Sequence, residues 1–161
     1  MKRILFPIWR FVAGLTTPSK GQNLRRLRER GESLSSLRIR EATPNDIPML
    51  AQLHVITWNA TYAPFFMKGP SVQIREQQWR TKFATADPNW FCLVVQRPDG
   101  QLVGFAQAGR SDHPDYAGEL GKIFLLRDYQ GLGLGKRLLS HGARRLMCIL
   151  MTIPTMPSSI R

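Results

Sequence analysis

Several features that mark other protein classes are scarce in this chain of 161 residues. It has two cysteines, Cys92 and Cys148, which lie far apart and lack any metal-ligand spacing. The three histidines are equally scattered, so the sequence indicates reduced thiols and no zinc site or other metal site. No uninterrupted apolar run reaches the about 18 residues that suggest a membrane span. We therefore expect a small cytoplasmic domain with no bound metal and no membrane span.

Acidic residues are also few, at 11 against 23 Lys and Arg, which gives a net charge of +12. Residues 1–36 hold eight basic and two acidic residues, a balance of +6. Residues 37–161 hold the remaining fifteen basic and nine acidic residues, again +6. The longer part is mildly basic, which suits an anionic ligand, whereas the short first part is strongly basic and needs its own explanation.

Residues 1–36 allow three interpretations. The start of the chain hints at a signal peptide, but Arg10 interrupts its apolar stretch and no small-residue cleavage site follows. The basic run from Arg25 to Arg30 could contact nucleic acid or an anionic membrane, although no aromatic residues are interleaved with it. The interpretation we adopt is a basic, flexible leader, or an over-extended start of the gene. We expect no specific nucleic-acid partner.

The most informative pattern is a glycine-dense turn, Gln130–Lys136, which follows the apolar run Ile123–Leu126 and precedes a helical pattern. A strand, a glycine loop and a helix start form a phosphate cradle, because glycines let the backbone approach an anion that the free amides then bind. Gly131 to Gly135 encloses three residues, whereas a Walker loop needs four. The pattern G-x-G-x-G also differs from the dinucleotide fingerprint G-x-G-x-x-G. Spacing therefore excludes both common phosphate loops.

Hydrophobic patterning and turn residues predict one mixed α/β domain, in the order β-α-α-β-β-β-α. Thr43, Pro44 and Asp46 predict the start of the first helix, and Pro64 its end. The predicted elements are a strand over 36–41, helices over 43–63 and 72–83, a hairpin of strands 90–96 and 102–109, a polar loop over 111–118, a strand over 119–126 and a helix after the glycine turn.

The segment Gln130–Gly135 resembles motif A of the GNAT (GCN5-related) N-acetyltransferases, Gln/Arg-x-x-Gly-x-Gly/Ala, at every fixed position. Glu119–Leu126 looks like the fourth strand of that family, and Leu37–Asp46 and His54–Tyr62 are similar to its opening strand and first helix. The resemblance runs from about Leu37 to Met147. It implies the GNAT acyl-CoA N-acyltransferase fold, with transfer of acetyl from acetyl-CoA to an amine of a small molecule or peptide.

The same resemblance implies roles for individual residues. Glu119 stands where some family members place their catalytic base, although a surface carboxylate paired with Lys122 or Arg110 would look the same in sequence. Trp58 and Tyr62 would face the acceptor, or would equally well be core aromatics. The implied cofactor-binding groups are the backbone of Phe124, Leu125 and Leu126 for the pantetheine arm, the amides of Gly131, Leu132, Gly133, Leu134 and Gly135 for the pyrophosphate, and Gln130 and Lys136 beside it.

The chain departs from the family after the glycine turn. The catalytic acid is usually a tyrosine beyond a fifth strand, but the tyrosines here are Tyr62, Tyr116 and Tyr129. We expect a fold that is truncated after the motif A helix near Met147, an irregular tail over 148–161 and an open edge on the fourth strand. The alternative function is therefore an impaired or inactive remnant that at best binds CoA. The sequence alone does not specify the acceptor or the oligomeric state.

Overall fold

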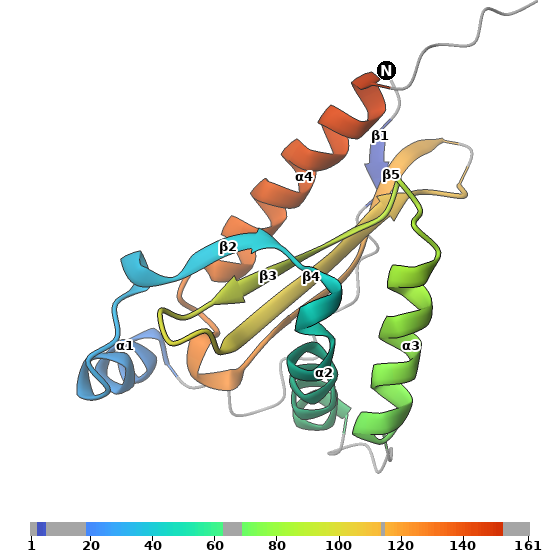
Figure 1. The fold of residues 1–161 in the computed structure, drawn as a ribbon. Coiled ribbons are helices and arrows are strands. Elements are labelled where there is room, and N and C mark those ends of the chain that lie inside the picture. Colours follow the sequence, from blue (N-terminus) through green and yellow to red (C-terminus); the bar gives the residue numbers. More distant parts are fainter. Residues whose placement is uncertain (1–2, 6–18, 63–68, 114, 153–161) are drawn as a thin grey trace, which may run out of the picture.

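The computed structural model describes residues 3–5, 19–62, 69–113 and 115–152. A five-stranded sheet, in the order β1-β5-β4-β3-β2, forms its centre. Helices α2 and α3 cover one face of the sheet and α4 covers the other (Figure 1). The elements are β1 (Arg3–Leu5), α1 (Lys20–Glu29), β2 (Arg38–Glu41), α2 (Ile47–Tyr62), α3 (Val72–Ala84), β3 (Phe91–Gln96), β4 (Leu102–Arg110), β5 (Tyr116–Leu125) and α4 (Leu134–Thr152), with short 3-10 turns at Leu34–Ser36, Pro44–Asp46 and Arg127–Tyr129.

The predicted order β-α-α-β-β-β-α is confirmed by β2, α2, α3, β3, β4, β5 and α4. Strands β2 to β5 pair antiparallel, and β3 and β4 form the expected hairpin. One boundary was predicted wrongly, since β5 begins at Tyr116 inside the expected loop. Gly118 pairs with Arg110 there, and a Cβ on Gly118 would lie 3.1 Å from the Leu146 side chain. A residue with turn character is therefore used for close contact between strand and helix.

Alternation along β3 divides the core into two apolar clusters. Leu93 and Val95 pack with Leu138 and Leu146 of α4, and Leu27 of α1 belongs to the same cluster. On the other face, Val94 packs with Leu50 of α2, Trp79 of α3 and Phe105 of β4. Five consecutive residues of β3 are buried, so this strand is internal to the sheet on both faces.

The prediction of a flexible leader over residues 1–36 is wrong for its second half. Helix α1 begins after Ser19, whose Oγ accepts a hydrogen bond from the Gln22 amide at 3.3 Å, while the Gln22 side chain accepts from the Ser19 amide at 3.0 Å. Leu27 is 2% exposed and Asn23 is fully buried. Helix α1 is thus part of the packed domain. Residues 1–2 and 6–18, where the signal-like stretch falls, lie outside the described residues.

The irregular tail expected over 148–161 is likewise wrong at its start, because α4 continues to Thr152. Leu146 is 1% exposed and Ile149 packs against the α4 side of the core. The run Met147–Thr152 lacks clear periodicity but also lacks a helix breaker, and Pro154 is the first one. Residues 153–161 lie outside the described residues. Within the described ranges, no helix combines the length and apolar character needed to cross a membrane.

The expected open edge on β5 is only partly present. Strand β1 pairs parallel with the first part of β5, with Arg3 opposite Tyr116, Ile4 opposite Gly118 and Leu5 opposite Glu119. From Leu120 to Leu125, β5 has β4 on one side and no strand partner among the described residues on the other. This long-range pairing is not visible in the sequence, and it leaves one short stretch of strand edge directly before the glycine turn.

Candidate functional site

The glycine turn joins the end of β5 to the start of α4. Gly131 and Gly133 adopt φ angles of +72° and +82°, in the left-handed region that favours glycine. A Cβ built on either residue would meet nothing within 4 Å. The glycines are therefore required by backbone conformation and border open space, as expected of a turn that receives a ligand from outside.

Backbone donors gather at this turn. The first hydrogen bond of α4 runs from the Arg137 amide to the Gly133 carbonyl, at 3.1 Å. Within the described part of the chain, the amides from Gly131 to Lys136 donate to no protein acceptor. They lie at the positive end of a helix of 19 residues that has no acidic residue in its first turn. An anion with several oxygens matches this set of donors.

The side chains of the turn mostly serve its structure. Leu132 and Leu134 are 8% and 1% exposed, so they can offer only backbone groups to a ligand. Gln130 donates from Nε2 to the Leu125 carbonyl at 2.9 Å, which ties the turn back to the end of β5. Lys136 is exposed and is the cation next to the free amides.

Helix α1 supports the turn from the other side. Asn23 donates from Nδ2 to the carbonyls of Arg127 and Gln130, each at 3.0 Å. Asp128 pairs with Arg26 at 2.7 Å and also with Arg30. Hydrogen bonds from these guanidinium groups, of which that from Arg30 has the larger effect, hold the pKa of Asp128 below its usual range. Helix α1, which was not predicted from the sequence, thus fixes the chain that leads into the glycine turn.

Tyr129 belongs to the same support. Its hydroxyl donates to Oε2 of Glu32 at 2.5 Å, and its side chain is 2% exposed. Burial, with the Glu32 carboxylate, raises the pKa of Tyr129 to about 12. A hydroxyl held in this way is not available as an acid at the glycine turn.

The outer edge of β5 offers backbone groups beside the turn. The Leu126 amide donates to the Val103 carbonyl at 2.9 Å, so it is already used within the sheet. Hydrogen-bonded pairs alternate along an antiparallel ladder, which places Phe124 opposite Phe105 in such a pair and turns the backbone groups of Ile123 and Leu125 outward. Sequence reasoning did not single out Ile123, although alternation from Leu125 would have identified it.

Glu119 lies in β5 before this open stretch. It is half-buried, and it is opposite Gly109 of β4 and Leu5 of β1. Because Leu120 packs toward α4, Glu119 lies on the α2–α3 face of the sheet. Among the described residues, no ion pair joins Glu119 to Lys122 or Arg110. The paired surface carboxylate that the sequence allowed is therefore not found.

Trp58 and Tyr62 stack near the carboxyl end of α2. Their ring centroids are 4.8 Å apart, with the planes inclined by 39°, and both residues are half-buried. Gly69 packs directly on Trp58, since a Cβ at Gly69 would lie 2.5 Å from Cε3 of the indole. The two aromatics are thus brought together, one and two turns beyond His54.

Four further residues on this face were not predicted as site residues from the sequence: His54, Arg75, Trp79 and Lys122. The His54 ring lies 5.8 Å from that of Trp79, 5.2 Å from Phe105 and 5.5 Å from Phe124. Burial lowers the pKa of His54 to about 3, and the charges of Arg75 and Lys122 act in the same direction. His54 is therefore a neutral imidazole at physiological pH. A signal for Arg75 existed, because it repeats with Val72, Trp79 and Phe83 at helical spacing.

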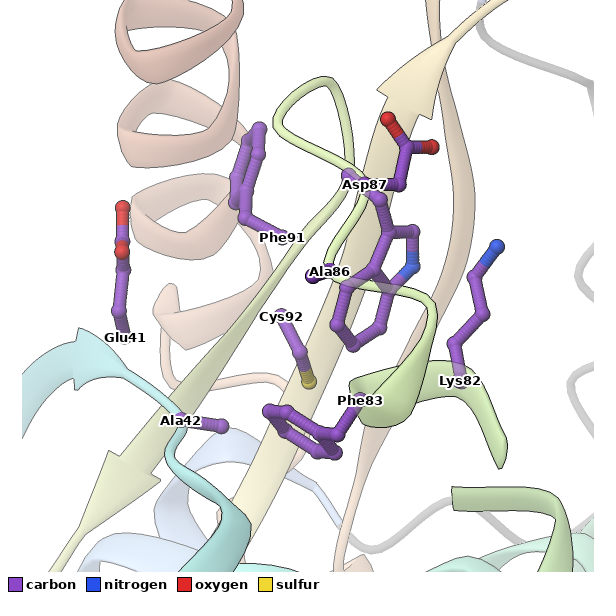
Figure 2. A pocket seen from close by; sticks show the side chains of 9 residues that line it. Glu41, Ala42, Lys82, Phe83, Ala86, Asp87, Phe91 and Cys92 are labelled. Atoms are coloured by element: carbon purple, nitrogen blue, oxygen red, sulfur yellow. The ribbon is translucent and has the colours of Figure 1, made fainter. Parts of the chain in front are cut away.

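A pocket of about 290 Å³ lies elsewhere, between the end of α3 and the start of β3 (Figure 2). Its lining includes Lys82, Phe83, Trp90 and Cys92, and none of the residues predicted to bind a ligand. Strands β3 and β5 both run antiparallel to β4, so this pocket and the glycine turn lie at opposite ends of the sheet. Burial raises the pKa of the Cys92 thiol, which keeps it protonated and unreactive.

Comparison with known proteins gives a consistent result. Residues 50–152 match the model of the family described as "Acetyltransferase (GNAT) family". The chain is 32% identical over 115 residues to the "Uncharacterized N-acetyltransferase YuaI" of Bacillus subtilis (strain 168). That alignment covers 68% of this chain and 64% of the relative, so the chain spans less than two thirds of the length of that protein.

Solved structures agree on the fold. The PaiA N-acetyltransferase of Thermoplasma acidophilum, in complex with coenzyme A, matches with a TM-score of 0.50 and 21% identity, over 70% of this chain and 73% of that one. A GNAT superfamily phosphinothricin acetyltransferase of Sinorhizobium meliloti, in complex with AcCoA, matches with a TM-score of 0.56 and 22% identity, over 70% and 60%.

Proposed function

Since this chain belongs to the GNAT acetyltransferase family, we propose that it transfers an acetyl group from acetyl-CoA to the amine of a small molecule or peptide. The observation that carries the proposal is the row of unused amides from Gly131 to Lys136 at the start of α4. A pyrophosphate offers several anionic oxygens to such a row, and the open space above Gly131 and Gly133 leaves room for it. Gln130 and Lys136 flank these amides.

The edge of β5 before the turn is proposed to bind the pantetheine arm of the same ligand. Outward backbone groups of Ile123 and Leu125 can pair with the amides of an extended arm, in the manner of an added strand. The Leu125 carbonyl already accepts from Gln130, so the Leu125 amide and the Ile123 backbone are the groups left without a partner among the described residues. The backbone of Phe124 faces Phe105, and the Leu126 amide is bonded to Val103. These two residues would therefore lie along the arm without pairing with it.

Acetyl-CoA supplies a thioester, and the protein must deliver a neutral amine to it. Glu119 is proposed as the base that takes the proton of the substrate ammonium, directly or through water. Its carboxylate lies on the α2–α3 face and forms no ion pair within the described residues. Trp58 and Tyr62 are proposed to border the acceptor on the same face.

A second candidate function is CoA binding without turnover. It is favoured by Tyr129, which directly precedes the glycine turn, because its hydroxyl is held by Glu32 and cannot protonate a departing thiolate. In this case the turn would bind the cofactor without transfer.

Two measurements separate these functions. Calorimetric titration with acetyl-CoA reports binding, and thiol release with a panel of amines reports transfer. Binding with amine-dependent thiol release supports the transferase. Binding without release for any amine supports the second function, and absence of binding contradicts both.

A further inference from the structure

Arg75 occupies an unusual position for a charged residue. It lies on α3 in the series Val72, Arg75, Trp79 and Phe83, whose other members pack on the sheet side of the helix. The residue is only 8% exposed. A guanidinium on the apolar face of a helix is thus buried between α3 and the rest of the domain.

No acidic side chain neutralises this charge in the part of the chain that the structure describes. All eleven acidic residues of the chain lie within the described ranges, and none of them pairs with Arg75. Its Nη1 donates to the neutral Gln78 side chain at 2.9 Å, and its Nε has no acceptor among the described residues. A buried ion without a counter-ion is strongly unfavourable in a protein interior. The arrangement therefore needs an anion that the described chain does not provide.

Further polar groups without partners lie on this face of the sheet. His54 Nδ1 and Trp79 Nε1 are buried without hydrogen-bond partners in the described structure. The two rings are in contact, and Trp79 lies one helical turn from Arg75. Lys122, an exposed residue, lies two residues before Phe124 on the same face of β5 and adds a second cation. Burial, followed by the charge of Arg75, lowers the pKa of His54, and partial desolvation of its ammonium, followed by the charge of Arg75, lowers the pKa of Lys122, so the three groups share one electrostatic environment.

The charge lies beside the proposed reaction centre. Phe124, one of the residues proposed to lie along the pantetheine arm, packs on His54 with ring centroids 5.5 Å apart. Glu119 shares this face of β5, yet pairs with neither Arg75 nor Lys122. An acceptor that enters between α2, α3 and β5 would thus meet a base near the start of the strand and two cations further along.

We propose that Arg75, with Lys122 beside it, receives a carboxylate of the acceptor, so that the substrate is an amine that also bears a carboxylate, as a free amino acid does. This inference rests on the acetyltransferase function proposed above and names its substrate class. A guanidinium binds a carboxylate through two parallel hydrogen bonds, which would use the free Nε of Arg75.

The test uses the full chain and matched ligands. Each common L-amino acid is compared with its carboxamide, which keeps the amine and side chain but removes the negative charge. Binding is measured by calorimetry with and without CoA, and transfer by thiol release. We expect the preferred amino acid to bind about tenfold or more tightly than its carboxamide. Equal affinity across every pair, or no binding by any amino acid, overturns the proposal.

Two variants locate the effect. Arg75→Met is expected to abolish the preference for the amino acid over its carboxamide, mainly by weakening the binding of the amino acid. It should also raise Tm of the unliganded protein, by about 4 °C, because an unpaired buried charge is removed. Arg80→Met is the control, since Arg80 lies on the same helix with a 58% exposed side chain paired with Glu76. Unchanged preference in Arg75→Met contradicts the proposal.

Failure of this inference is distinct from failure of the proposed function. Thiol release with carboxamides or simple amines, at rates no lower than with amino acids, would keep the transferase and overturn the role of Arg75. Carboxylate binding that depends on Arg75 without any binding of acetyl-CoA would keep the anion site and overturn the transferase.

Discussion

The side chain of Asn23 bonds the carbonyl of Gln130 across 107 positions of sequence, at 3.0 Å. A second bond from the same amide nitrogen reaches the Arg127 carbonyl. Helix α1 thereby fixes the chain immediately before the turn proposed to bind pyrophosphate. The basic amino-terminal part of the chain has a structural function that charge alone did not reveal.

Asn23→Ala is expected to weaken both folding and acetyl-CoA binding. Two part-buried carbonyls lose their donor, and each hydrogen bond lost should lower the free energy of unfolding by about 1 kcal/mol. Urea denaturation and calorimetric titration measure the two effects. Arg25→Ala is the control, because Arg25 is exposed on the same helix and pairs only with Glu29. Unchanged acetyl-CoA affinity in Asn23→Ala would show that α1 does not position the turn.

Gly133→Ala tests the turn itself. The new methyl group costs about 1–2 kcal/mol in the left-handed conformation and would occupy the space proposed for the pyrophosphate. Gly100→Ala is a matched control, since Gly100 has φ +90° in the hairpin between β3 and β4. Both variants should lose similar stability by denaturation. Only Gly133→Ala should lose acetyl-CoA affinity, by about tenfold or more, and equal affinities would contradict the assignment of the turn.

The pH dependence of stability should reveal the protonation of His54. Its folded pKa of about 3 lies below the ordinary value, so the unfolded chain takes up a proton first as pH falls. The contribution of neutral His54 to the free energy of unfolding is full above about pH 6.5 and is lost between about pH 6.5 and 3, amounting to roughly 5 kcal/mol when lost completely. Arg40 lowers the pKa of Asp46 to about 2, so Asp46 affects stability only below about pH 4.

His54→Leu should therefore flatten the stability curve between about pH 4 and 6.5, measured by urea denaturation at a series of pH values. The exposed His141 is the control, and His141→Gln should keep the slope of the unmodified protein. An unchanged slope in His54→Leu would mean that His54 is not held neutral.

Glu119→Gln tests the proposed base. The amide cannot accept the ammonium proton, so kcat should fall by about 10²-fold or more while the affinity for acetyl-CoA stays constant. Steady-state thiol release over a pH series checks this, with Glu76→Gln as control, since Glu76 pairs with Arg80 on α3 and is not one of the proposed site residues. Full activity in Glu119→Gln would assign the proton transfer to another group.

Local signals predicted the part of the fold that depends on neighbouring residues. The hairpin around Arg97–Gly100, the start of α3 at Val72 and the glycine turn follow from turn chemistry and helical spacing. Helix α1 was missed because it is polar, with Leu24 and Leu27 its only apolar side chains, although the Ser19–Gln22 capping box was present. The capping box indicates the start of this helix, whereas the net charge of the segment carries no information on its secondary structure.

Contacts distant in sequence could not be predicted in this way. The pairing of β1 with β5 and the bonds of Asn23 join segments about 100 residues apart, and no periodicity encodes them. Arg75 was overlooked for another reason: an arginine among apolar residues at helical spacing normally extends its charge to solvent, and only the structure shows its guanidinium buried.

The most direct test of the central claim is the affinity of the unmodified chain for acetyl-CoA, compared by calorimetry with that for S-acetylpantetheine, which lacks the pyrophosphate. If the amides from Gly131 to Lys136 bind the pyrophosphate, acetyl-CoA should bind with 1:1 stoichiometry and about tenfold or more tightly than the shorter thioester. Equal affinities, or no binding of acetyl-CoA, would contradict the assignment of this turn as the cofactor site.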